Sequence, residues 1–166
     1  MKQRLYIAYG SNLNLPQMAH RCPTAKVVGK SEIKDYELLF RGGRRGGVAT
    51  GEPKEGSSVP VLLWDIKPRD EVALDRYEGY PSLYQKKNLN LELNGRSVEA
   101  MVYVMTPGHA AGSPSDYYYN VIAEGYQTAG FDQNVLEQAL ERSEELMLQE
   151  QDADPELGGQ LGLKWW

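Results

Sequence analysis

The sequence predicts an α+β fold, a small mixed β-barrel with flanking helices. Short strand-like segments fill the first two-thirds of the chain, and helical periodicities fill the remainder. The composition, 41% hydrophobic and 25% charged residues, is typical of a globular domain rather than a disordered chain. Because so many short strands have edges that need cover, they favour a closed or nearly closed barrel.

The first elements predict a strand, a turn and a helix in quick succession. Residues 5–9 form the strand, and Gly10, Ser11 and Asn12 end it. Asn14 can cap a short helix that has Pro16 in its first turn. Four further strands are expected next: two within 26–40, with a bend near 29–31, then 48–50 and 59–66.

The middle of the chain carries the clearest local signals. Pro68 opens a short helix, and Gly79 stands where a helix C-cap requires a positive φ. Farther on, alternating apolar residues flank Asn94 and Gly95. Because Asn-Gly favours a type I′ turn, this segment is predicted to be a β-hairpin.

Two helices complete the domain, which we assign to residues 1–150. Ser115 caps the first helix, and Asp132 caps the second. Residues 151–166 lose periodicity and are read as an acidic, Gly-rich tail that ends in Trp165 and Trp166. These tryptophans form either a free end or an anchor that docks on a groove.

Charge and composition exclude several classes of protein. Residues 137–166 hold eight acidic and two basic residues, so the rest of the chain is nearly neutral and offers no general attraction for nucleic acid. No apolar run is long enough for a transmembrane helix, and no signal peptide is evident. With Cys22 as the single cysteine, no intrachain disulfide can form, and we expect a cytoplasmic protein. A monomer and a homodimer both remain open.

The turn formed by residues 9–13 is the first candidate for function. A strand that enters a small-residue turn and then a helix exposes successive backbone N–H groups. Such a turn can cradle a carboxylate or a developing oxyanion. The alternative is a plain connection between a strand and a helix.

Glu78 is the second candidate. It falls at the C-terminal end of the predicted helix, where the helix dipole disfavours negative charge, and tyrosines flank it. In a partly buried site these effects would raise its pKa toward neutrality, as a general base requires. The alternative is an ordinary surface glutamate.

Other reactive residues form no convincing set. Cys22 is read as a buried cysteine beside His20, and His109 lies in a Gly/Ala-rich loop. No spacing suggests zinc, and we expect no metal and no cofactor. Residues 41–47 contain two Arg-Gly-Gly triplets, which form a flexible loop, a mobile lid or a short RNA-binding segment; in the last case Arg44 and Arg45 would bind RNA.

Three motifs in order resemble the gamma-glutamylcyclotransferase-like family. They are Tyr-Gly-Ser-Asn-Leu at residues 9–13, Leu-Asp-x-x-Glu-Gly at residues 74–79, and Pro-Ser-x-x-Tyr-x-x-x-Ile-x-x-Gly at residues 114–125. The stretch between the first two, including 48–50 and 59–64, is also similar. The resemblance covers roughly residues 4–130 and excludes the tail.

The resemblance implies a pocket at the mouth of the barrel and a small gamma-glutamyl molecule as substrate. Glu78 would be the catalytic carboxylate. The substrate-binding residues would be Tyr9, Gly10, Ser11, Asn12, Leu13, Tyr84 and Tyr118, although Tyr84 stands one residue closer to Glu78 than in the family pattern.

The chemistry implied is cyclisation of the substrate onto itself. The substrate's α-amino group attacks its own γ-carbonyl and releases 5-oxoproline with an amine or amino acid, so the enzyme needs neither a nucleophile nor a metal. Glu78 would serve as general acid and base. The alternatives are hydrolysis or transfer of a related gamma-glutamyl or aminoacyl amide, and a module without activity that binds small molecules or RNA.

Overall fold

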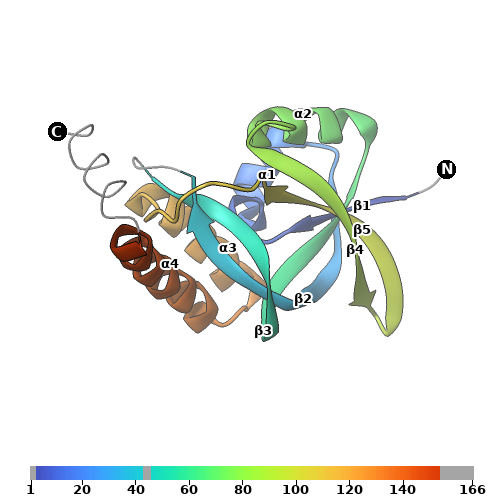
Figure 1. The fold of residues 1–166 in the computed structure, drawn as a ribbon. Helices are drawn as coiled ribbons and strands as arrows, with labels where there is room; N and C mark the ends of the chain where they lie inside the picture. The colour runs from blue at the N-terminus through green and yellow to red at the C-terminus, as the bar shows by residue number, and fades with distance from the viewer. Residues whose placement is uncertain (1–2, 43–45, 154–166) are drawn as a thin grey trace.

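One mixed five-stranded sheet with four α-helices makes up the fold (Figure 1). The computed structural model describes residues 3–42 and 46–153. The strand order is β2-β3-β1-β5-β4, with β1 parallel to β5 and the other neighbours antiparallel. The elements are β1 (Arg4–Ala8), the 3₁₀ helix η1 (Ser11–Leu13), α1 (Leu15–Arg21), β2 (Lys26–Arg41), β3 (Val48–Ile66), α2 (Pro68–Glu78), β4 (Tyr84–Leu93), β5 (Arg96–Met105), α3 (Asp116–Ala129) and α4 (Gln133–Ala153). The α+β class is therefore confirmed.

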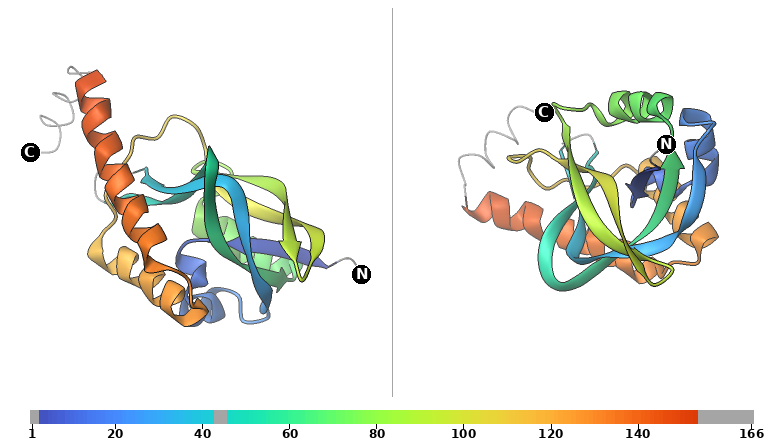
Figure 2. Two further views of the ribbon diagram at one scale, coloured as in Figure 1. Left: turned by 90° about the horizontal axis from the view of Figure 1, so that it is seen from below. Right: turned by 90° about the vertical axis from the view of Figure 1, so that its right-hand side faces the viewer.

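The sheet curls strongly but does not close into a barrel (Figure 2). Its edge strands, β2 and β4, share no backbone ladder in the described chain. They meet through side chains instead. Ser31 Oγ donates to Glu92 O at 2.6 Å, and a Cβ on Gly29 would lie 2.6 Å from Leu93 Cδ1. Of the two expected forms, a closed or a nearly closed barrel, full closure is therefore excluded: the sheet is curled and open.

The strands β2 and β3 are longer than the sequence predicts. Residues 26–40 belong to one strand, not two, and 48–50 and 59–66 are parts of the single strand β3. Irregularities in the register at Val27/Gly29 and Lys34/Tyr36 bend the pair without ending it. The predicted bend near 29–31 is therefore a bulge inside a continuous strand.

The predicted caps and the hairpin turn are confirmed. Asn94 and Gly95 adopt φ values of 52° and 80° between β4 and β5, as a type I′ turn requires. Gly79 ends α2 with φ at 67°. The side chains of Asn14, Ser115 and Asp132 each accept a backbone N–H at the start of α1, α3 and α4. No helix in the described ranges is long and apolar enough to cross a bilayer.

The expected tail boundary lies inside a helix, because α4 continues through Ala153. Trp165 and Trp166 lie outside the described residues, as do Arg44 and Arg45 of the Arg-Gly-Gly loop. The predictions about an anchoring end and an RNA-binding loop therefore rest on residues that the structure does not describe.

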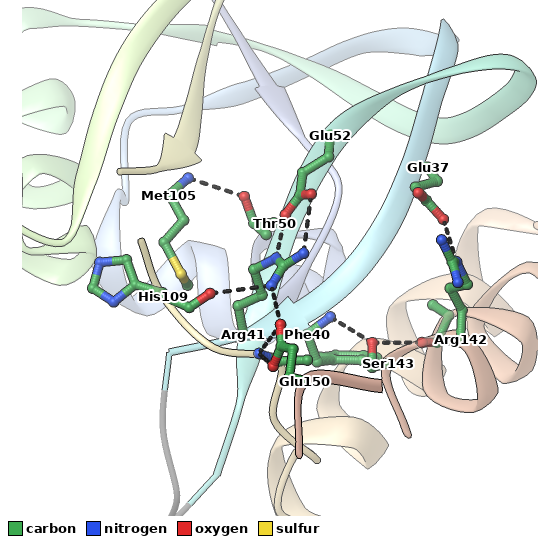
Figure 3. Close-up of polar contacts among 12 residues, drawn as sticks. Glu37, Phe40, Arg41, Thr50, Glu52, Met105, His109, Arg142, Ser143 and Glu150 are labelled. Atoms are coloured by element: carbon green, nitrogen blue, oxygen red, sulfur yellow. Dashed lines mark hydrogen bonds and ion pairs between the residues drawn. The ribbon is translucent and has the colours of Figure 1, made fainter. Parts of the chain in front are cut away.

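The helix α4 covers the outer edge of β2 (Figure 3). Phe40 N donates to Ser143 Oγ at 2.9 Å, and Phe40 O accepts from Gly112 N at 3.0 Å. Near the end of α4, Glu150 accepts from Arg41 Nη1 at 3.2 Å and from the Ala111 backbone N–H. These contacts satisfy edge groups that would otherwise be free to pair with another strand.

Replacing Ser143 by alanine is expected to destabilise the fold. Ser143 is fully buried, and the change leaves the Phe40 N–H without an acceptor, which costs about 1–3 kcal/mol. Urea unfolding should show this loss in Ser143→Ala, whereas Glu144→Ala, at the exposed neighbouring position, should unfold close to the wild type. Equal unfolding midpoints for both variants would contradict this account of the edge.

Candidate active site

A cavity of about 260 Å³ opens where β1 ends. It lies between the turn after β1, the last residues of α2, the start of β3 and the first turn of α3. Its walls are unusually rich in tyrosine. The lining residues are Tyr6, Ile7, Tyr9, Gly10, Ser11, Asn12, Val48, Ala49, Tyr77, Glu78, Leu83, Tyr84, Tyr103 and Tyr118.

The 9–13 turn contains two backbone N–H groups without a partner in the described chain, on residues that line this cavity. Gly10 precedes η1, in which Leu13 N donates to Gly10 O at 3.0 Å. The N–H groups of Ser11 and Asn12 come before the first hydrogen bond of the helix, and no acceptor among the described residues takes them. The turn therefore has the free donors that an anion or a carbonyl oxygen would need.

Gly10 allows this turn to approach the sheet closely. A Cβ at this position would lie 3.2 Å from Ala49 Cβ and 3.7 Å from the Tyr118 hydroxyl. The first contact is tighter than ordinary van der Waals packing, so a side chain would push the turn away from β3.

The side chains of Ser11 and Asn12 are held in place by hydrogen bonds. Ser11 Oγ lies 2.7 Å from the Tyr77 hydroxyl. Asn12 Nδ2 donates to the Tyr6 hydroxyl at 2.9 Å, and Asn12 Oδ1 accepts from Arg21 Nη1 at 2.6 Å. Both side chains are buried, so these bonds also satisfy polar groups that have left water.

Glu78, the last residue of α2, faces the same cavity. No side chain or backbone group of the described chain hydrogen bonds to its carboxyl group. Burial raises its pKa to about 7, and the positive charge of Arg21 opposes part of that rise. The sequence predicts a raised pKa from the helix dipole and the neighbouring tyrosines. In the structure, the main cause of the raised pKa is desolvation of the carboxylate.

Tyr84 and Tyr118 bind the two backbone polar groups of one residue, Ala49. The Tyr84 hydroxyl donates to Ala49 O at 2.6 Å, and the Tyr118 hydroxyl accepts from Ala49 N at 3.0 Å. Burial raises the pKa of both phenols, so both stay neutral. The Tyr118 hydroxyl keeps its own proton and can still donate it into the cavity.

Of the predicted substrate-binding residues, Leu13 is the one that the structure leaves out of the cavity wall. Its side chain is fully buried, and its N–H is already bonded to Gly10 O. A Cβ on Gly125 would lie 2.7 Å from Leu13, so the residue supports the turn from behind. Leu13 therefore packs behind the turn and does not line the cavity.

The structure adds four residues that the sequence argument missed. Tyr6, Tyr77 and Tyr103 line the cavity, and Arg21 contacts Asn12 behind it. The sequence signals for these tyrosines were their number, 11 in the chain, and for Tyr77 its position directly before Glu78. Nothing local in the sequence indicates Arg21, because its contact with Asn12 depends on how α1 folds back on the turn.

The remaining reactive residues take no part in the cavity. Cys22 is buried and donates weakly to Asp70 O at 3.6 Å, and burial raises the pKa of its thiol to about 11. The interpretation of Cys22 as a buried cysteine is confirmed. His109 Nε2 lies 3.0 Å from Thr106 Oγ1 in the loop after β5. Among residues 3–42 and 46–153, no group of three His, Cys, Asp or Glu residues is arranged to hold a metal ion.

Comparison with known proteins gives consistent matches. The profile of the family described as "Gamma-glutamyl cyclotransferase, AIG2-like" matches residues 6–125. Gamma-glutamylcyclotransferase of Mus musculus is 28% identical over 142 residues, 80% of this chain and 75% of the mouse protein. The Homo sapiens protein of that name is 27% identical over 135 residues, 76% and 71% of the two chains. A solved structure named gamma-glutamyl cyclotransferase superposes with a TM-score of 0.73 at 25% identity, covering 83% of this chain and 86% of its own.

Proposed function

Because the chain belongs to the gamma-glutamyl cyclotransferase, AIG2-like family, we propose that it cyclises gamma-glutamyl amides. The products are 5-oxoproline and a free amine or amino acid. One observation carries this proposal. Glu78, whose pKa is raised to about 7, shares one cavity with Ser11 and Asn12, whose backbone N–H groups have no partner in the described chain. These are the two elements that the reaction requires of a protein, a proton carrier and an oxyanion acceptor.

The reaction begins with the transfer of a proton from the substrate's α-ammonium group to the Glu78 carboxylate. The freed amine attacks the γ-carbonyl carbon, a C–N bond forms, and the carbonyl oxygen becomes an oxyanion. The N–H groups of Ser11 and Asn12, which have no acceptor among the described residues, donate to this oxyanion.

The intermediate collapses when the bond to the leaving amine breaks. Two protons leave the ammonium nitrogen in all, one before the attack and one from the new ring nitrogen. Both end on the leaving amine, which departs as an ammonium ion, and Glu78 carries one of them at a time. The carboxylate is thereby regenerated for the next turnover.

The absence of a nucleophilic side chain from this scheme has a physical basis. The α-amine and γ-carbonyl belong to one molecule, so holding them in a reactive conformation can supply up to about 7–11 kcal/mol of the barrier. Proton transfer by one positioned carboxylate contributes on the order of 10²–10⁴-fold. The tyrosine-rich walls would hold the folded conformer.

The substrate is tested by incubating the full chain with a panel of gamma-glutamyl amines and gamma-glutamyl dipeptides. Mass spectrometry should detect 5-oxoproline together with the free amine for at least one member of the panel. Release of glutamate in place of 5-oxoproline would instead establish the alternative, a gamma-glutamyl amide hydrolase. Transfer to an added amine would appear as a new gamma-glutamyl amide.

The pH dependence follows from the state of Glu78. The base form is the carboxylate, and its pKa is raised to about 7, so kcat/KM should fall as the pH drops through about 7. An unperturbed glutamate would lose activity only near about pH 4.3. Initial rates measured across this range locate the acid limb, which is the fall of kcat/KM toward low pH. An acid limb near the pKa of an unperturbed glutamate would contradict the role of Glu78 as base.

A further inference from the structure

Arg21 contacts several parts of the site without lining the cavity. It is the last residue of α1. One guanidinium nitrogen donates to Asn12 Oδ1 at 2.6 Å, and another donates to Gln17 Oε1 at 2.8 Å. The guanidinium carbon also lies 3.5 Å from the centre of the Tyr77 ring. The side chain is therefore held on two edges and on one face.

These contacts form a closed circuit of side chains that joins the 9–13 turn to the end of α2. Arg21 binds Asn12 in the 9–13 turn and stacks on Tyr77 at the end of α2. The Tyr77 hydroxyl returns to Ser11 at 2.7 Å. Because Tyr77 directly precedes Glu78, this circuit links the N–H groups of the 9–13 turn to the residue that carries the carboxylate.

The geometry is specific to arginine. A planar guanidinium can donate to two acceptors in its plane while its face lies on an aromatic ring. A lysine ammonium would keep the positive charge but could not make the stacked, two-pronged contact. Arg21→Lys therefore separates the charge of the side chain from its shape.

The charge of Arg21 acts on Glu78. It favours the carboxylate and opposes the effect of burial on the pKa. The other titratable side chains that line the cavity with Glu78 are tyrosines. They come from β1, the turn after β1, α2, β4, β5 and α3, and they are Tyr6, Tyr9, Tyr77, Tyr84, Tyr103 and Tyr118.

We propose that Arg21 is a positioning residue for the cyclisation: it fixes the 9–13 turn relative to the end of α2, which carries Glu78. It does this through Asn12 and Tyr77 and does not touch the substrate. This inference rests on the proposed function. It assigns a role to a side chain that sequence motifs alone do not indicate.

The test compares Arg21→Gln and Arg21→Lys with a matched control, Arg96→Gln, which removes one positive charge from the exposed β4–β5 hairpin. For each variant, kcat and KM for the best gamma-glutamyl substrate are measured from about pH 5 to about pH 9, a range that spans the acid limb. Circular dichroism and thermal melting confirm that each variant folds.

In Arg21→Gln the acid limb of kcat/KM should move to higher pH, because the carboxylate has lost its nearby positive charge. Its kcat should fall by up to about 100-fold, the effect of misplacing reacting groups by about 1 Å. Arg21→Lys should keep the limb near its wild-type position but lose kcat. Arg96→Gln should match the wild type in both.

A lower kcat in Arg21→Gln with an unmoved limb would indicate general structural damage and would overturn the inference. A change confined to KM would indicate direct substrate binding and would overturn it too. Should Arg21→Gln fail to fold, wild-type kcat in Arg21→Lys would still disprove the need for the guanidinium. Failure of the proposed function itself is seen separately, as absence of 5-oxoproline with the wild-type chain.

Discussion

The Glu78→Gln variant is expected to fold and to bind substrate but to lose turnover by about 10²–10⁴-fold. Glutamine keeps the shape of the side chain and resembles the protonated acid, which burial already favours at this position. Stability should therefore change little, whereas proton transfer from the α-ammonium group is no longer possible. Steady-state rates of 5-oxoproline release, measured beside thermal melting, check both halves of the prediction.

Glu99→Gln is a suitable control, because Glu99 is exposed on β5 and outside the cavity. It should keep wild-type kcat and KM. Full activity in Glu78→Gln would rule out this carboxylate as the proton carrier, and loss of folding in place of turnover would assign Glu78 a structural role.

The second large effect is expected for Gly125→Ala on α3. A Cβ at this position would lie 2.7 Å from the Leu13 carbonyl carbon and 2.9 Å from Asn14 N, which are backbone atoms that cannot rotate away. Alanine gains about 1 kcal/mol over glycine in a helix interior. Overpacking costs about 1–3 kcal/mol. Because both contacts are under 3.0 Å and involve backbone, we expect the cost to exceed the gain.

The same substitution should also impair turnover. To relieve the contact, α3 must move away from the 9–13 turn, and a displacement of about 1 Å among reacting groups can cost about 100-fold in rate. Gln127→Ala, an exposed position of α3, should change stability by no more than about 0.5 kcal/mol. A Gly125→Ala protein as stable and active as this control would show that the turn does not depend on close packing with α3.

The features of the fold that depend on adjacent residues were predictable from the sequence. Asn94-Gly95 allowed positive φ at two successive positions, and Gly79 did so at the end of α2. Asn14 and Ser115 carry their cap acceptors three residues before the N–H groups that they bind. Each of these signals needs no knowledge of distant parts of the chain.

The lengths of β2 and β3 were not predictable in this way. Strand β3 contains several polar residues together with Gly56 and Pro60, a composition that predicts strand ends. The hydrogen-bonded ladder nevertheless continues past these positions. Asp35 adopts a φ of 61° opposite Gly56 at 84°, and Asp35 Oδ1 accepts from Gly56 N at 3.0 Å. This local irregularity maintains the pairing of two strands, which is a property of both segments together.

In the candidate site, too, some features were predictable from adjacent residues and others depend on distant segments. The sequence singled out Glu78 and the 9–13 turn, which the fold brings to one cavity. It could not reveal that burial is the main influence on Glu78, because desolvation depends on all the elements around the cavity. Leu13 was assigned to binding because it belongs to the motif, whereas its environment is the core behind the turn.

The most direct test of the account identifies the product formed in ¹⁸O-labelled water. Closure of the substrate onto itself breaks the amide without solvent, so 5-oxoproline from a reactive gamma-glutamyl amide should carry no ¹⁸O, and its formation should be lost in Glu78→Gln. Glutamate that contains ¹⁸O would show that water is the nucleophile and would contradict the central claim of cyclisation.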